Sequence, residues 1–213
     1  MARWGKPRSR STPWLRGAGA LSFIAGAAAL LGIITAEALY PDGYSTGASM
    51  ISDLGGTEPP NSIVVEPSAT IFDTTMMSTG LLVIVAAVLL YVARRRLTLV
   101  VPIAVFGLGA FGVGAFPGST GLPHNIFALT TFFAGGVAAV FSAGILKGPF
   151  RVLALVLGAV SLVNLIAYFI LQERWFVADL GLGGLERWIA YPIVVWLLGF
   201  GGYLMAGPPA DER

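Results

Sequence analysis

The sequence predicts an all-α integral membrane protein built as a six-helix bundle, and three observations support this fold class. The chain of 213 residues is 56% hydrophobic and only 11% charged, whereas soluble domains carry about 25% charged residues. Six apolar stretches reach the roughly 20 residues that are needed to cross a hydrocarbon core. The chain lacks the period-2 alternation that is typical of transmembrane barrels.

The six predicted spans divide the chain into one membrane domain and two tails. The spans cover residues 17–40, 70–93, 97–116, 124–146, 150–171 and 185–206. Very short connections at 94–96 and 147–149 predict that spans two and three, and spans four and five, are antiparallel neighbours. The predicted domains are a basic cytoplasmic tail at 1–16, a six-span domain at 17–206 with its long outer loop at 41–69, and a cytoplasmic tail at 207–213.

Lysine and arginine residues predict the orientation in the membrane, because cytoplasmic loops are enriched in both. With the N-terminus inside, eleven of the 13 basic residues lie on the cytoplasmic side, and only Arg174 and Arg187 lie outside. The prediction is a multi-pass cell membrane protein with both termini cytoplasmic. We interpret the basic first tail as an anchor on anionic lipid heads. Membrane lipids are therefore the expected partners, nucleic acid is not expected, and a homo-oligomer is left open.

Cysteine and glycine content limits the chemistry further. The chain has no cysteine, which excludes disulfides, thiol catalysis and cysteine-ligated metals. Glycines are dense in the third span and just after it, where small residues let helices in lipid approach closely. We predict a packing role for these five positions: Gly107, Gly109, Gly112, Gly114 and Gly118.

The unusual polar residues all fall on the predicted outer side. The outer loop holds Asp42, Asp53, Glu58 and Glu66 without one Lys or Arg. A charged side chain inside a span is costly unless it has a partner or a water-filled cavity. Arg187 is the natural counter-charge for such carboxylates, and one member of the adjacent pair Glu186–Arg187 is expected to face the bundle while the other reaches the surface. The predicted ligand-binding residues are Glu37, Asp73, Glu186 and Arg187.

Ser52, Asp53 and His124 are the candidate catalytic residues. A serine nucleophile would need His124 as its base, oriented by a carboxylate such as Asp73 or Glu186. A metal held by His124 together with Asp53, Asp73 or Glu186 is an alternative. Two simpler interpretations stay open: Ser52 and Asp53 form a turn before Gly55 and Gly56, and His124 is an interfacial residue at a helix start. The residues identify no cofactor and do not decide whether the protein is an enzyme.

Four short motifs, in order and spacing, resemble a six-span family of bacterial and archaeal membrane proteins called domain of unknown function 998. They are "ISDLG" at 51–55, "GAFPG" at 114–118, "PHN" at 123–125 and "GGLERWIAYPIVVW" at 183–196. The family often has an acidic residue after its Phe-Pro, where this chain has Gly118. The first motif also resembles the corresponding loop of DRAM/Sfk-type multi-span proteins, which implies a role with outer-leaflet lipids.

Three functional hypotheses follow from the sequence. The leading one is an outer-leaflet site that binds, and in an enzymatic version remodels, a lipid headgroup or similar amphiphile, with Arg187 on an anionic group. The second is a structural or interaction protein in which the same residues pin the first outer loop. The third is a small transporter, although the broken helices that mark a midplane site are not evident. A similarity to alkaline ceramidases does not carry over their mechanism, which needs three histidines, because this chain has one.

Overall fold

Six long helices form the protein, which confirms the predicted fold class. The computed structural model describes residues 13–93, 95–170 and 178–207. All six helices are long and apolar enough to cross a membrane, and the described residues contain no strand. The helices are α1 (Pro13–Ala38), α2 (Ser68–Val92), α3 (Leu97–Ala115), α4 (Leu122–Ser142), α5 (Pro149–Ile170) and α6 (Gly181–Ala206).

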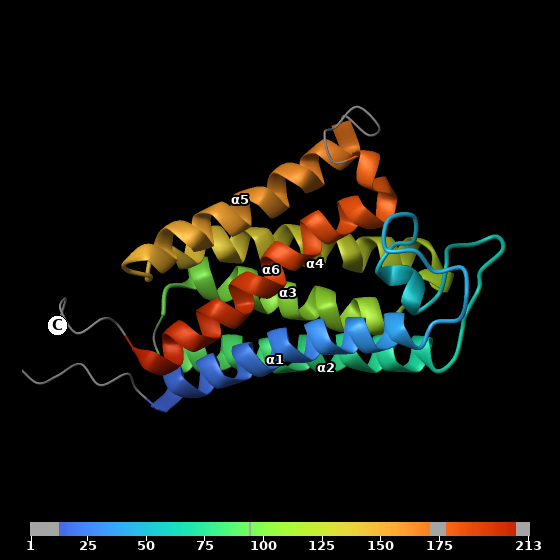
Figure 1. Cartoon of the computed structure of the whole chain (residues 1–213). Coiled ribbons are helices and arrows are strands. Elements are labelled where there is room, and N and C mark those ends of the chain that lie inside the picture. Colours follow the sequence, from blue (N-terminus) through green and yellow to red (C-terminus); the bar gives the residue numbers. More distant parts are fainter. Residues whose placement is uncertain (1–12, 94, 171–177, 208–213) are drawn as a thin grey trace, which may run out of the picture.

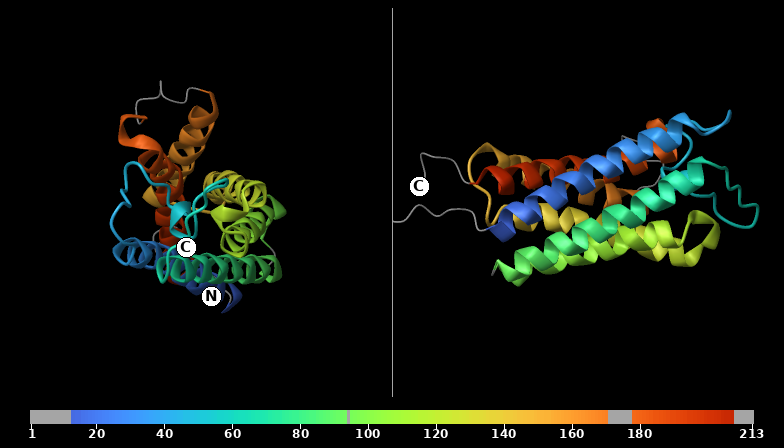
Figure 2. Two further views of the ribbon diagram at one scale, coloured as in Figure 1. Left: turned by 90° about the vertical axis from the view of Figure 1, so that its right-hand side faces the viewer. Right: turned by 90° about the horizontal axis from the view of Figure 1, so that it is seen from below.

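The helices follow one another around a ring. Each helix contacts the next one in the chain, and α6 returns to pack against α1. The predicted antiparallel pairs α2–α3 and α4–α5 are both present (Figure 1). The start of α1 and the end of α6 lie at the same end of the bundle, and the long connection between α1 and α2 lies at the opposite end (Figures 1 and 2).

The observed helices differ from the predicted spans mainly at their ends. Helix α1 (Pro13–Ala38) already includes residues 13–16, which were predicted to belong to the tail. Helix α6 begins at Gly181, four residues before the predicted start. Helix α4 ends at Ser142, before the predicted 146, because hydropathy marks the apolar stretch and not the last helical hydrogen bond. Residues 1–12, 94, 171–177 and 208–213, with Arg174 and most of both predicted tails, lie outside the described residues.

Glycines bring neighbouring helices into backbone contact, as predicted for the third span. A Cβ placed on Gly107 would lie 2.9 Å from the Gly80 carbonyl oxygen of α2, and one on Gly109 would meet Thr131 of α4. Gly19 of α1 and Gly201 of α6 approach each other in the same way. Any larger side chain at these positions would push the helix axes apart, so glycine sets how closely the ring closes.

The half of the bundle away from the long connection holds a tightly packed core. Trp196 of α6 is fully buried and stacks on Phe200. Its indole Nε1 donates to the Ser142 hydroxyl at 3.0 Å, and that hydroxyl donates to the Ala139 carbonyl oxygen at 2.6 Å. This end is therefore filled by side chains, and the space described below lies toward the other end.

Candidate functional site at the loop end

The connection between α1 and α2 folds back onto the helix ends and closes one end of the bundle. We call this the loop end, made of residues 37–73, 116–124 and 178–187, which include the adjoining turns of α1, α2, α4 and α6. Ile51 and Leu54 are buried there against Phe72 of α2 and Ile33 of α1. The short 3₁₀ helix η1 (Ser52–Leu54) follows Ile51 and ends at Leu54. Burial of these apolar side chains fixes the loop as a cap over the helices.

Arg187 is the hub of the loop end. Its Nη1 donates to the carbonyl oxygens of Thr46, Ser49 and Gly183 at 2.9, 3.1 and 3.0 Å. Its Nη2 donates to the Glu37 carboxylate and to the Tyr44 hydroxyl, the latter at 2.7 Å. The guanidinium thereby ties α6 to α1 and to the loop at once.

Tyr44 extends this network into the loop. Burial raises the pKa of Tyr44, so its hydroxyl keeps its proton. That hydroxyl donates to the Met50 carbonyl oxygen at 3.0 Å while it accepts from Arg187. The guanidinium carbon also lies 5.8 Å from the centre of the Tyr44 ring, within range of a cation–π contact. The expected pairing of Arg187 with Glu37 is confirmed, and the sequence did not indicate Tyr44 or the loop carbonyls.

Glu186 holds the same loop from the other direction. Its carboxylate accepts a hydrogen bond from the backbone N–H of Ile51, and the amide of Ser52 also interacts with it. The two adjacent residues therefore bind different backbone groups of the loop. Glu186 binds amides at the start of η1, and Arg187 binds the Thr46 and Ser49 carbonyls that precede it. The expectation that one of them reaches the surface is not met, because both end on the loop.

Ser52 and Asp53 form the turn that the simpler interpretation predicted. The backbone N–H of Met50 donates to the Asp53 carboxylate at 2.7 Å, and the Asp53 N–H donates to the Met50 carbonyl at 3.2 Å. Burial raises the pKa of Asp53, and the hydrogen bond from Met50 opposes this shift in part. Asp53 is thus a structural residue of the turn, and Ser52 faces the space between the helices.

His124 is buried at the start of α4 and contacts the end of α3. Its Nδ1 lies 2.8 Å from the Phe116 carbonyl oxygen. A carbonyl can only accept, so Nδ1 carries the proton in this contact. The last carbonyls of a helix have no partner within the helix, and the imidazole satisfies one of them at the end of α3. His124 therefore joins α3 to α4.

Asp73 does not meet its expected counter-charge. Its Oδ1 is buried and has no hydrogen-bond partner, and a Cβ placed on Gly55 of the loop would collide with it. Of the two carboxylates for which Arg187 was the natural counter-charge, Glu37 pairs with it and Asp73 does not. The loop carbonyls and Glu37 hold the guanidinium at α1 and α6.

Gly118 lies directly against the long loop. A Cβ at Gly118 would collide with the carbonyl oxygen of Gly56 in the loop. Gly56 itself has a φ of +147°, a conformation that glycine adopts without strain. The two glycines let the loop pack directly on the α3–α4 connection.

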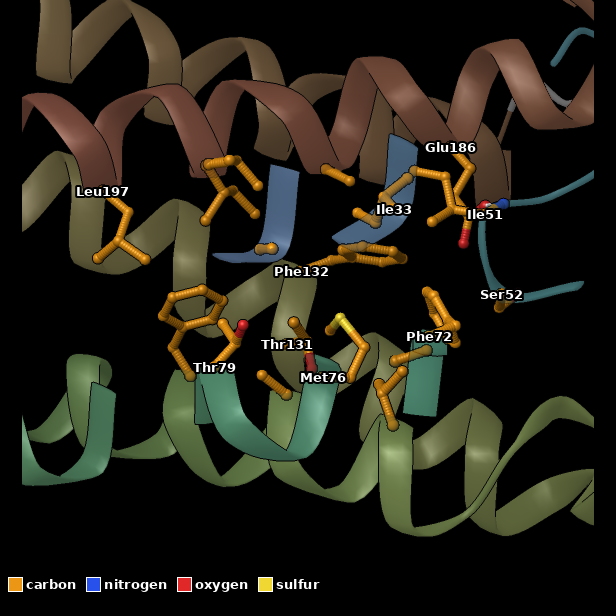
Figure 3. Close-up of a pocket in the computed structure, with 18 of the residues that line it drawn as sticks. Ile33, Ile51, Ser52, Phe72, Met76, Thr79, Thr131, Phe132, Glu186 and Leu197 are labelled. Carbon is orange, nitrogen blue, oxygen red and sulfur yellow. Dashed lines mark hydrogen bonds between the residues drawn. The ribbon is translucent and has the colours of Figure 1, made fainter. Parts of the chain in front are cut away.

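A cavity of about 60 Å³ lies beneath the loop, between five of the six helices. One water molecule needs roughly 10–15 Å³ of such space, so several could fit. Figure 3 shows Glu186, Ile51 and Ser52 at its loop end and Leu197 at the other. Helix α5 contributes no lining residue, and the wall is mostly apolar, with Ile33, Phe72, Met76 and Phe132 among its side chains.

The few polar side chains of the wall are mostly engaged by the protein itself. Thr131 donates to the Phe127 carbonyl at 2.7 Å, and Thr79 lies 3.5 Å from the Ala25 carbonyl. His124 and Glu186 have the partners given above. Apolar side chains therefore line most of the length of the cavity, and Ser52, His124 and Glu186 lie near its loop end.

The candidate catalytic residues are neighbours, but they are not arranged as a triad. Ser52 and His124 line the same cavity, yet within the described ranges no hydrogen bond joins them, and His124 Nδ1 faces a backbone carbonyl in place of a carboxylate. In the part of the chain that the structure covers, no three His, Asp or Glu side chains cluster as a metal site. A catalytic role for Ser52, Asp53 and His124 stays a prediction.

The fold and the loop end together define a class: a six-span membrane protein with a loop-capped internal cavity. The family model for the protein of unknown function DUF998 matches residues 5–203, and the chain belongs to this family. The resemblance seen in the four motifs is thereby confirmed. No curated protein and no solved structure matches the chain.

Proposed function

We propose that this protein binds a membrane amphiphile, with the apolar chain of the ligand in the central cavity and its polar group beneath the loop. One observation carries this proposal: a mostly apolar cavity that ends at a few polar side chains. Ligand sites in proteins commonly combine an apolar wall with a small number of placed polar groups.

The length of the cavity supports a lipid-like ligand. Its lining on α6 runs from Glu186 to Leu197, and eleven residues of α-helix span about 16 Å. The hydrocarbon core of a bilayer is about 30 Å thick, so the cavity has the depth of one leaflet. A narrow space of this length suits a single acyl or alkyl chain.

A second candidate function is favoured by the contacts of Arg187. Nη1 and Nη2 of Arg187 both donate to groups of the protein itself. This is expected if the only role of the loop end is to hold α1, α6 and the loop together. In that case the protein is a structural or interaction protein, and the cavity is unused packing space.

A cavity-filling substitution separates the two candidates. Ala110 of α3 lines the cavity and is buried, whereas Ala115 of the same helix is exposed. We expect native mass spectrometry of wild type and Ala115→Leu, extracted with their lipids, to show a bound amphiphile that is lost in Ala110→Leu. Ala128→Leu, which fills the space from α4, should give the same loss and guards against a local folding defect in one variant.

The structural candidate predicts the opposite result. If the cavity is unused, wild type carries no specific adduct, and filling it adds apolar contacts, so Ala110→Leu unfolds at the same or a higher temperature. Retention of the adduct by both Ala110→Leu and Ala128→Leu would equally contradict the proposal. Size-exclusion chromatography in detergent checks that each variant is folded.

A further inference from the structure

The charges around the cavity bear on which amphiphile it would accept. Glu186 is the one formally charged side chain among the described residues that line it, and no Lys or Arg lines it. Arg187, which follows Glu186 in the chain, is not a lining residue, and its Nη donors bind Glu37, Tyr44 and the loop. A charged ligand group in the cavity therefore meets a carboxylate first.

The other charged side chains of the loop end are also mostly negative. Of the eleven acidic residues of the chain, three (173, 211 and 212) lie outside the described residues, and the other eight are all at the loop end: Glu37, Asp42, Asp53, Glu58, Glu66, Asp73, Asp179 and Glu186. Among the described basic residues only Arg187 lies there. The summed field of such a surface attracts cations and repels anions.

The contacts of Glu186 offset its charge only in part. It receives hydrogen bonds from backbone amides, which are neutral dipoles, and it is attracted by the guanidinium of Arg187. That guanidinium also forms an ion pair with Glu37. In a cavity walled by hydrocarbon the effective dielectric constant is low, so a charge at the loop end is screened less than in water. A cationic group there gains from Glu186, whereas an anionic group meets no Lys or Arg among the described lining residues.

We propose that the cavity selects single-chain amphiphiles with a cationic amine head over those with an anionic head. This inference rests on the proposed function and adds the class of ligand to it. It also replaces the expectation that Arg187 engages an anionic group, since the Nη1 and Nη2 donors of the guanidinium already bind the protein. The ammonium group would lie beneath Ile51 and Ser52, with Glu186 as its counter-charge and the alkyl chain directed toward Leu197.

Three probes with one chain length and different heads test the selection: tetradecylamine, tetradecanol and tetradecanoic acid. Each is added at low mole fraction to protein in a neutral maltoside detergent, and binding is measured by native mass spectrometry. We expect wild type to bind the amine about 10-fold or more tightly than the acid at pH 7.5, with the alcohol between them, in line with a Coulomb term of one charge pair.

Two carboxylate variants locate the effect. Glu186→Gln removes the charge and keeps an oxygen that can accept from the Ile51 N–H, so the loop stays attached. It should reduce the preference for amine over acid to about 3-fold or less and leave binding of the alcohol unchanged. Glu58→Gln, an exposed loop residue that does not line the cavity, should keep most of the preference.

The two levels of the proposal fail in different ways. Equal binding of amine and acid by wild type, or an unchanged preference in Glu186→Gln, would overturn the cation selection while alcohol binding still supports an amphiphile cavity. The proposed function itself is wrong if none of the three probes binds to wild type. It is also wrong if all three bind to Ala110→Leu as tightly as to wild type, because the cavity is then not the ligand site.

Discussion

At the residue scale, Arg187 determines most of the geometry of the loop end. One guanidinium binds three backbone carbonyls, a carboxylate and a phenol. Lysine cannot replace it, because an ammonium group lacks the planar fork that reaches several acceptors at once. The exposed fractions of the Arg187 and Glu37 side chains are 11% and 20%, so the ion pair is shielded from water but not fully buried.

Removal of either partner of this ion pair should destabilise the protein. We expect Arg187→Gln and Glu37→Gln each to lower the free energy of unfolding by roughly 2–3 kcal/mol, below the roughly 3–5 kcal/mol for one partner of a fully buried pair. The double variant should lose less than the sum, with a coupling of about 1–2 kcal/mol. Chemical unfolding in detergent measures all four proteins.

Arg151, an exposed basic residue at the opposite end, supplies the control. Arg151→Gln should change the free energy of unfolding by no more than about 0.5 kcal/mol. Strictly additive losses in the double variant would mean that Arg187 and Glu37 act separately and that the carbonyl contacts alone hold the loop.

Asp53 gives the loop end a pH dependence. Burial raises its pKa, so the charged form is less favourable in the folded protein than in the unfolded chain. A raised pKa contributes stability that is fully present below the ordinary carboxyl pKa of about 3.9 and is lost as the pH rises through the folded value. Asp53→Asn stays neutral, and its amide oxygen can still accept from Met50.

The difference in melting temperature between Asp53→Asn and wild type should therefore be close to zero near pH 4 and grow in favour of the variant toward pH 7. Thermal unfolding across this range measures it, and other titrating groups cancel in the difference. Asp42→Asn, in an exposed part of the same loop, is the matched control. A variant that is less stable than wild type at pH 7 would show that the negative charge of Asp53 stabilises the turn.

At the scale of the elements, helix contacts depend on small residues as well as on hydrophobicity. In lipid the apolar tails compete for every hydrophobic face, so close packing has to hold the helices together. Exposed side chains of α5 such as Val152, Val156, Ile166 and Phe169 are suited to lipid. Helices α2 and α3, by contrast, meet through Gly80 and Gly107.

Gly80→Ala should disrupt this contact. Its Cβ would meet the Phe111 nitrogen and the Gly107 carbonyl oxygen of α3, and backbone atoms cannot move aside as a flexible side chain can. We expect a loss of about 1–3 kcal/mol in the free energy of unfolding. At Gly202 of α6 a Cβ meets nothing within 4 Å, so Gly202→Ala should be neutral or stabilise by up to about 1 kcal/mol. Equal effects would show that helix propensity, and not the α2–α3 contact, governs these positions.

At the scale of the whole molecule, the two ends carry opposite charge. The described basic residues other than Arg187 are Arg16, Arg95, Arg96, Lys147 and Arg151, all at the end away from the long loop, and the described acids are all at the loop end. Because lysine and arginine are retained on the cytoplasmic side, this asymmetry predicts that the loop end faces away from the cytoplasm.

The absence of cysteine in the chain makes the orientation directly measurable. Asn61 is exposed in the long loop, and Thr98 is exposed at the start of α3 at the other end. A membrane-impermeant maleimide should label Asn61→Cys in intact cells and Thr98→Cys only after permeabilisation. The reverse labelling would place the cavity mouth in the cytoplasmic leaflet and contradict the predicted topology.

Much of the fold could be predicted from the sequence, because lipid imposes simple rules. Backbone polar groups in hydrocarbon must be paired within each segment, so six long apolar stretches can only be six helices, and short connections leave little choice of neighbour. The same rule pushes charged residues to the ends of the spans. This is why Glu37, Asp53, Asp73, His124, Glu186 and Arg187 could be predicted as one group.

The roles of those residues were decided by the tertiary structure. Three of the five partners of Arg187 are backbone carbonyls, and the group that binds Glu186 is a backbone amide of the loop. A sequence carries no signal for which carbonyl or amide will face a given side chain. The cavity likewise arises from where small and large residues of five helices meet, which depends on the angles and spacing of the helices. Hydrophobicity along the chain thus determined the six spans and their polar end, whereas three-dimensional packing determined that this end closes over an apolar space.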